Sequence, residues 1–513
     1  MAPSRSDLRS PPPADPKGPL RSPGGAASGP AEPDPRGLPG LAQAHDRIAA
    51  LVARARAAQR VAEGYHQARV DELVTAAGWA IMEPARNREL AELAVADTGI
   101  GNVADKVAKN HRKTLGLLRD LQGAKSVGVI AEDAARGLVE IARPVGVVCA
   151  VTPSTNPGAT PANKIINALK GRNAVIVAPS PKGASTAHRL AQFVRAQLER
   201  IGAPPDLVQV LPAPVDKAGT LELMRQCDLV VATGSQANVR AAYASGTPAF
   251  GVGAGNVAAI VDETVTAAAD IEAAAERITR SKTFDHATSC SSENSLVLLE
   301  TVAERVIAAL QRRGAVRLGA TQIERLQALM WPDGNLSPAV IGQSAAVVAG
   351  RAGLSDIAAM QPSMLLVEED TAAIGPAHPF SGEKLCPVLA LYRAATFEAA
   401  AGIVERIYAH QGAGHSVGLH TTRPERAVQL GLTLPVSRVI VNQAHCIATG
   451  GSFDNGLPFS LSMGCGTWGR NNFSDNMTYR HYLNITRISR PIAERVPTED
   501  EIFGGFFGRH GRA

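Results

Sequence analysis

The chain has 513 residues, of which 45% are hydrophobic and 19% are charged, and its formal net charge is +5. This length is enough for two or three domains with cores of their own, and the composition is that of an ordinary globular protein. So small a charge gives no ground for a nucleic-acid or membrane partner. The sequence also lacks the apolar runs of a signal peptide or a spanning helix, so we expect a soluble, cytoplasmic protein.

Residues 1–42 are rich in Pro, Gly, Ser, Ala and Arg. Such a composition buries too little apolar surface to offset the entropy lost on ordering, so we expect a disordered extension, with a targeting or docking tail as the alternative. The six cysteines show no CxxC pair, which favours free thiols in a reducing compartment. No spacing of His and Cys predicts a metal site.

Three helical patterns come next. Apolar residues recur at intervals of three and four over 45–80, and helical patterns also cover 86–96 and 106–121. The rhythm then changes, because two short apolar stretches flank a polar turn within 125–143. This pattern predicts a β-hairpin, which we expect to project as an arm.

From residue 145 onward, apolar strands alternate with helices. The strands are expected at 145–151, 174–178, 207–211 and 229–232, with helices at 162–170, 184–200 and 217–226. The alternation resumes after Ser295 and continues to 439–441. Nearly all-apolar strands alternating with helices indicate an α/β fold of two doubly wound domains. The late stretch 483–488 reads as a strand that would pair with the hairpin.

Cys290 lies in a short polar stretch between a predicted helix and a strongly apolar strand. Such a position exposes a thiol to a cleft, where a lowered pKa would make it a nucleophile. An ordinary buried thiol is the alternative, and it is the expected state of the other five cysteines.

Asn156 follows the strand 145–151, at the edge where α/β sheets place ligands. Its amide is a candidate donor to a developing oxyanion, with an Asn-Pro turn as the alternative. Small residues at 233–235 join a strand to a helix and would aim backbone N–H groups at a phosphate. Glu383 precedes a strand and is either a ribose hydroxyl acceptor or a solvated carboxylate. The GVGAGN segment at 251–256 looks like a dinucleotide fingerprint but lacks its context, so we expect close backbone packing near a site.

Together and in this order, the motifs resemble the aldehyde dehydrogenase superfamily over about residues 43–495. The resemblance implies Cys290 as nucleophile, Asn156 as oxyanion donor and Glu383 as ligand of the nicotinamide ribose. It places Thr233, Gly234 and Ser235 beside the cofactor pyrophosphate and nicotinamide, with Thr152 and Pro153 also at the cofactor.

The superfamily fold implies a division of the chain. A cofactor domain would comprise 43–124 and 144–262, and a catalytic domain 263–482. An oligomerisation arm would comprise 125–143 and 483–491, giving a homodimer or homotetramer, and 492–513 would form a tail.

The segment GVGAGN replaces the family's glutamate-bearing stretch and offers no base to activate water. With GAGH (412–415) and GCGTWG (464–469), it is typical of the acylating branch, which passes the acyl group to coenzyme A. His415 is a candidate base for the incoming thiol, with a structural loop histidine as the alternative.

Within that branch the chain is most similar to acylating sulfoacetaldehyde dehydrogenases, on residues 152–174, 283–295 and 450–469. Candidate ligands of the sulfonate, each with a packing or solvated role as the alternative, are Arg470, Arg480, His481, Lys164, Asn455 and Ser460. Dehydrogenases for acetaldehyde or other short aldehydes, a hydrolytic enzyme and a catalytically silent scaffold are the other readings.

The cofactor is expected to be NADP, with NAD as the alternative. The stretch 177–182 follows a predicted strand and contains Ser180 and Lys182 but no acid. NAD-specific members often place an acid there to bind the ribose, so its absence would leave room for a 2′-phosphate.

Overall fold

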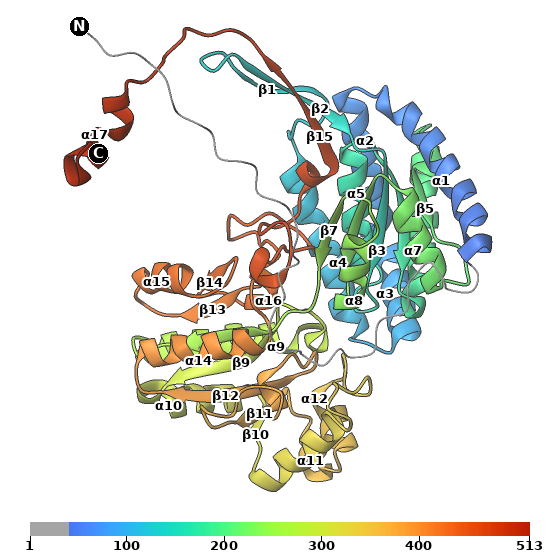
Figure 1. Cartoon of the computed structure of the whole chain (residues 1–513). Helices are drawn as coiled ribbons and strands as arrows, with labels where there is room; N and C mark the ends of the chain where they lie inside the picture. Colours follow the sequence, from blue (N-terminus) through green and yellow to red (C-terminus); the bar gives the residue numbers. More distant parts are fainter. Residues whose placement is uncertain (1–40, 513) are drawn as a thin grey trace, which may run out of the picture. The chain divides into compact units, whose positions relative to one another are not determined.

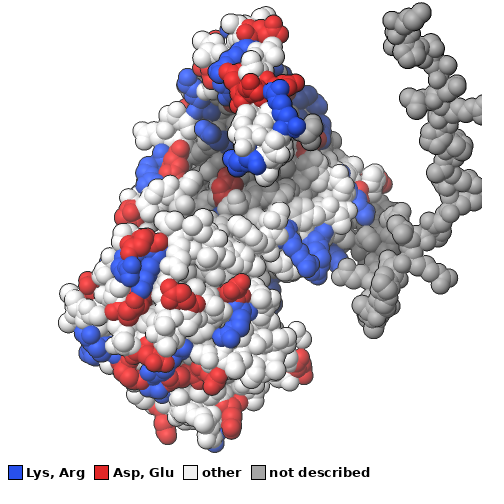
Figure 2. All heavy atoms as spheres, turned by 60° about the vertical axis from the view of Figure 1, so that its left-hand side comes forward, with Lys and Arg blue, Asp and Glu red and all other residues white. Residues whose placement is uncertain are grey.

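The computed structural model describes residues 41–512 (Figure 1). The predicted N-terminal extension lies outside the described residues, except that positions 41 and 42 open helix α1 (Leu41–Glu63). No helix in the described range is long and apolar enough to cross a membrane. In Figure 2, basic and acidic side chains are interspersed on the face shown.

Four helices precede the first sheet. The helix expected at 45–80 is two helices, α1 and α2 (Gln67–Met82), because the chain breaks at Gly64 and His66 caps α2 through its ring nitrogen. Helices α3 (Pro84–Thr98) and α4 (Val103–Leu121) follow. Pro84 occupies the first turn of α3, where its missing N–H costs nothing.

The first sheet is parallel, with strand order β5-β4-β3-β6-β7. Its strands are β3 (Val147–Thr152), β4 (Ala174–Pro179), β5 (Val208–Val210), β6 (Leu229–Thr233) and β7 (Ala249–Val252). The helices that connect or follow them are α5 (Ala159–Lys170), α6 (Ala184–Arg200), α7 (Lys217–Gln226) and α8 (Gln236–Tyr243). The strand order reverses between β3 and β6, which makes their carboxyl ends the place where such sheets bind a dinucleotide.

The second sheet is also parallel, with order β10-β11-β12-β9-β8-β13-β14. Its strands are β8 (Val257–Val261), β9 (Glu293–Leu299), β10 (Ala315–Arg317), β11 (Met364–Glu368), β12 (Val388–Ala394), β13 (Val417–His420) and β14 (Val439–Val441). Its helices are α9 (Ala268–Thr283), α10 (Glu300–Arg312), α11 (Ala320–Met330), α12 (Ala345–Arg351), α13 (Ser355–Ala359), α14 (Phe397–His410), α15 (Glu425–Thr433) and α16 (His445–Ala448). The α/β fold class is thus confirmed.

A third, antiparallel sheet has the order β1-β2-β15. The hairpin strands β1 (Gly128–Asp133) and β2 (Leu138–Pro144) pair with each other, and β15 (Leu483–Ser489) pairs with β2 along its whole length. This sheet joins the two segments that the sequence assigns to an arm. Beyond it lies helix α17 (Glu499–His510), which has no buried residue.

The boundary between the two large units differs from the expected one in two places. Strand β8 pairs with β9 and β13, so the second sheet begins at Val257 rather than after residue 262. Phe459, Phe473, Met477 and Tyr482 pack into the core of the first sheet rather than that of the second. Apolar patterning predicts a buried strand but does not say which sheet it joins.

Candidate active site

Cys290 lies between the short 3-10 helix η4 (Phe284–Ala287) and strand β9, and it is half-buried. Its Sγ atom is 3.6 Å from Nε2 of His415, which is contributed by the loop before β13. Nδ1 of His415 shares a hydrogen bond of 2.7 Å with Oγ of Ser416. Burial, with Arg438 and His445 nearby, lowers the pKa of His415 to about 3, so the ring is neutral and can accept a proton.

The protonation of Cys290 differs from the sequence-based expectation. Desolvation, followed by the carboxyl of Glu383 and the thiol of Cys465, raises the pKa of Cys290 to about 12. The resting group is therefore a thiol rather than a thiolate. In the predicted nucleophilic role the thiol would have to lose its proton, and Nε2 of His415 is in contact with it.

The GVGAGN segment packs directly against the nucleophile. A Cβ atom on Gly255 would lie 2.5 Å from the carbonyl oxygen of Cys290. That distance is too short for a Cβ–oxygen contact, so only glycine fits at this position. The backbone N–H of Gly255 donates to Oε1 of Glu383 at 3.3 Å. Desolvation raises the pKa of Glu383 to about 8. The close backbone packing expected for this segment is present, and it joins Cys290 to Glu383.

The residues predicted to bind the cofactor lie at the ends of β3 and β6. Thr152 and Thr233 are the last residues of these neighbouring strands, and Thr233 Oγ1 lies 2.8 Å from Ser462 Oγ. Gly234 leads into α8, and Ser235 caps that helix by accepting from the N–H of Asn238. Backbone N–H groups at this helix start can face a phosphate. Pro153 follows Thr152 in the same loop.

Lys182 lines a separate cavity of about 670 Å³ beyond the end of β4. Lys182 belongs to the 3-10 helix η2 (Pro181–Gly183), which follows Ser180. The cavity also contains an acid that sequence reasoning missed, Asp97 from α3. Asp97 accepts hydrogen bonds from the hydroxyl of Ser185 and from Thr186, so its carboxylate is already engaged.

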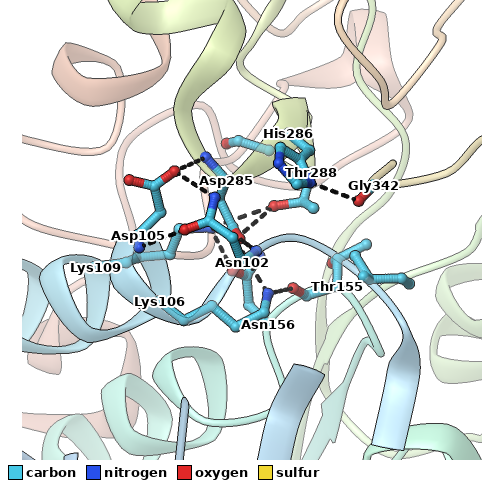
Figure 3. Close-up of polar contacts among 12 residues, drawn as sticks. Asn102, Asp105, Lys106, Lys109, Thr155, Asn156, Asp285, His286, Thr288 and Gly342 are labelled. Atoms are coloured by element: carbon cyan, nitrogen blue, oxygen red, sulfur yellow. Dashed lines mark hydrogen bonds and ion pairs between the residues drawn. The ribbon is translucent and has the colours of Figure 1, made fainter. Parts of the chain in front are cut away.

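Asn156 lies in the loop between β3 and α5, and its side chain is bound by a lysine (Figure 3). Nζ of Lys109, on α4, donates to Oδ1 of Asn156 at 2.8 Å. The same Nζ donates to Oδ2 of Asp285 at 2.6 Å and to Oγ1 of Thr288 at 3.3 Å. Thr288 is two residues before Cys290, so one ammonium group connects the candidate oxyanion donor to the segment of the nucleophile.

Asp285 is buried and is held by several donors. It accepts from Lys106, from Lys109, from the backbone N–H of Asn102 and from Thr288. Burial opposes its charge, but the two lysines prevail and hold the pKa of Asp285 below its usual value. Lys106 and Lys109 are three residues apart and lie on one helix face, but that spacing alone does not distinguish a buried pair from a solvated one.

The chain is strained just before the nucleophile. Asp285, His286 and Ala287 have φ values of 51°, 51° and 58°, a left-handed region that costs a residue with a side chain about 1–2 kcal/mol. Gly101 packs so closely on Asp285 that its Cβ would lie 1.9 Å from Oδ1. Such strain persists only where surrounding contacts enforce it, and it clusters at functional sites.

The six candidate sulfonate ligands are not brought together. Lys164 is buried beneath the first sheet and donates to the carbonyls of Val151 and Val231 at 2.7 Å. Asn455 donates to Gln443 and to the carbonyl of Ala448, and Ser460 donates to the carbonyl of Ser462. Arg470 and Arg480 are exposed, and His481 packs against aromatic rings. In the range that the structure describes, none of the six is hydrogen-bonded to Cys290, His415 or Asn156.

Comparison with known proteins gives concordant matches. The model of the aldehyde dehydrogenase family matches residues 40–328. The sulfoacetaldehyde dehydrogenase (acylating) of Cupriavidus necator is 64% identical over 469 residues, covering 91% of this chain and 94% of that protein. The enzyme of the same description from Bilophila wadsworthia is 42% identical over 463 residues, covering 89% and 98%. Among solved structures, an acetylating aldehyde dehydrogenase from Geobacillus thermoglucosidasius is similar with a TM-score of 0.83 at 34% identity, covering 89% and 99%.

Proposed function

The chain belongs to the aldehyde dehydrogenase family, and from that premise we propose that it is an acylating enzyme that oxidises sulfoacetaldehyde and passes the sulfoacetyl group to coenzyme A. The observation that carries the proposal is the 64% identity, over nine-tenths of the chain, to an acylating sulfoacetaldehyde dehydrogenase. The reaction is reversible, because one thioester is exchanged for another.

The chemistry begins at Cys290. Its Sγ attacks the aldehyde carbon while His415, 3.6 Å away, takes the thiol proton. The developing oxyanion is stabilised by the side-chain amide of Asn156 and the backbone N–H of Cys290. A nicotinamide cofactor, when bound, accepts the hydride, and the acyl group is then held as a thioester on Cys290.

Transfer to coenzyme A, rather than hydrolysis, follows from the surroundings of the thioester. Because Gly255 is packed on the carbonyl of Cys290, position 255 has no space for a side chain, and no residue of GVGAGN carries a group that would deprotonate water. The neutral His415 has a lowered pKa and is a weak base. Such a base is better matched to a thiol, with a pKa of about 8.5, than to water, with a pKa of about 15.7.

An anionic substrate is favoured by the charge on α4. Lys106, Lys109 and Lys113 lie buried on one face of this helix, and Asp285 pairs with only the first two. Nζ of Lys113 donates to the carbonyl of Gly450 at 2.7 Å, and no carboxylate pairs with it among residues 41–512. Desolvation lowers the pKa of Lys113 to about 7, so the group is only partly charged near neutral pH. A sulfonate close to it would favour the charged ammonium.

The proposal extends to the residues that would bind the cofactor and to the assembly of the protein. Thr152, Pro153, Thr233, Gly234, Ser235 and Glu383 would hold the nicotinamide half of the cofactor, and Ser180 and Lys182 the adenosine half. Lys182 favours NADP over NAD, because it supplies a positive charge where a 2′-phosphate would lie. The protein would act in the cytoplasm as a homodimer or homotetramer, assembled through the sheet β1-β2-β15.

The test is reduction of NADP by the purified protein with sulfoacetaldehyde, with and without coenzyme A, and with acetaldehyde alongside. We expect turnover that requires coenzyme A and prefers sulfoacetaldehyde. Preference for acetaldehyde would overturn the substrate but keep the mechanism, whereas turnover without coenzyme A would overturn the acylating assignment.

A further inference from the structure

We propose that Lys109, held by Asp285, is a positioning residue that fixes the orientation of the Asn156 amide for stabilisation of the oxyanion. The inference rests on the proposed function, since it assigns a role in the same acylation step. Neither Lys109 nor Asp285 belongs to the set of residues that the family resemblance implies.

The two ends of the Asn156 side-chain amide differ in what they can bind. A side-chain amide has an oxygen that accepts and an NH₂ group that donates, whereas an ammonium group only donates. Lys109 Nζ lies 2.8 Å from Oδ1 of Asn156. Oδ1 therefore faces Lys109, and the NH₂ group points away from it, free to donate to an oxyanion. Within residues 41–512, no other hydrogen bond of the Asn156 side chain fixes this choice.

The ammonium group of Lys109 is itself held by hydrogen bonds. An ammonium group has three N–H donors, and Lys109 has three acceptors within 3.3 Å: Asn156, Asp285 and Thr288. Figure 3 shows them converging on Nζ from separate parts of the chain. With every donor engaged and the side chain buried, the ammonium has little freedom to move. Because Thr288 lies two residues before Cys290, the same ammonium group contacts both the segment of the proposed nucleophile and the proposed oxyanion donor.

The neighbouring Lys106 allows the positioning role of Lys109 to be distinguished from a role in balancing the charge of Asp285. Lys109 contributes most to the lowered pKa of Asp285, but the carboxylate would keep three other donors without it, Lys106, Asn102 and Thr288. Lys106 donates to Asp285 at 3.1 Å and to the backbone carbonyl of Thr155, but not to the Asn156 side chain. Lys106 is thus a matched control: it has the same residue type, the same helix face, the same carboxylate partner and similar burial.

The experiment compares Lys109→Met with Lys106→Met in the full-length protein. We expect Lys109→Met to lower kcat about a hundred- to thousand-fold, as the loss of an oxyanion donor does, with the KM for NADP little changed. Lys106→Met should lower kcat much less. Equal losses in the two variants would overturn the proposal, because they would indicate a general need for charge in the cluster.

A double-variant comparison excludes a merely structural role. If Lys109 acts through Asn156, the variant Lys109→Met/Asn156→Ala should be no slower than Asn156→Ala alone, whereas independent roles would multiply the two losses. Lys109→Arg keeps a donor toward Oδ1 and should restore part of kcat, which also supplies a readout if Lys109→Met does not fold. No restoration by Arg in a folded protein would count against the proposal. Full turnover of Asn156→Ala would instead refute the oxyanion role in the proposed function.

Discussion

The Sγ atom of Cys290 lies 3.6 Å from Nε2 of a neutral, buried His415. The pair differs from a preformed thiolate–imidazolium pair, because desolvation raises the pKa of the thiol to about 12 and lowers that of the imidazole to about 3. The site therefore keeps an uncharged nucleophile until the substrate arrives. An unreactive resting thiol is also protected from adventitious oxidation, which requires thiolate character.

This arrangement predicts a steep pH dependence for alkylation of Cys290. A pKa raised above the solution range means that the thiolate fraction grows about tenfold per pH unit while the pH stays below that pKa. Inactivation by iodoacetamide should therefore keep accelerating from pH 7 to beyond pH 9. A plateau near pH 8.5, the value of an ordinary thiol, would contradict the raised pKa. The variant Cys290→Ser, compared by counting alkylated thiols, identifies the reacting residue.

The packing of Gly255 predicts that one methyl group disrupts the site. Gly255→Ala would place a Cβ 2.5 Å from the carbonyl oxygen of Cys290, so the backbone of the nucleophile must move. A displacement of about 1 Å can cost about a hundredfold in rate, and we expect a loss of that order in kcat. Gly253→Ala is the control, because its Cβ would meet only the end of the Gln236 side chain, which can move aside. Similar kinetics for the two variants would refute the argument.

The sequence was sufficient to predict the α/β class and the pairing of the hairpin with the late strand, whereas the roles of Cys290 and Asn156 stay predictions. Apolar strands and their carboxyl ends are local patterns, so residues at strand ends can be identified without coordinates. Lys109 could not be identified in this way, because a lysine in a helix usually faces solvent. Its burial depends on tertiary packing around α4, which includes its contact with Asp285, 176 residues later in the chain.

The raised pKa of Cys290 could not be predicted from the sequence for a related reason. Polar neighbours such as Ser289 and Ser291 suggested an open, polar site. The thiol is instead enclosed by segments that are distant in the sequence, including those of Glu383 and Cys465, and desolvation dominates its pKa. Desolvation depends on tertiary packing, which no local pattern encodes.

Lys113, which has no carboxylate partner among residues 41–512 and whose pKa desolvation lowers to about 7, is predicted to discriminate between substrates. Lys113→Met keeps the length of the side chain but removes the ammonium group, and a charge-assisted hydrogen bond is worth about 1.5–3 kcal/mol. We expect kcat/KM for sulfoacetaldehyde to fall about ten- to a hundredfold, while that for acetaldehyde stays within a few-fold. Measuring both aldehydes with one preparation controls for folding. Parallel losses for the two would show that Lys113 supports the structure and does not recognise the sulfonate.

Lys182 predicts the choice between the two nicotinamide cofactors. Its side chain is exposed at the rim of the cavity beyond β4, and Asp97, the acid in that cavity, is engaged by Ser185 and Thr186. Removing the positive charge with Lys182→Ala should raise the KM for NADP about tenfold, the worth of a single charge-assisted contact to a phosphate. The KM for NAD should change little, because NAD has no 2′-phosphate. Equal effects on both cofactors, or a wild-type protein that prefers NAD, would show that this lysine does not select the phosphate.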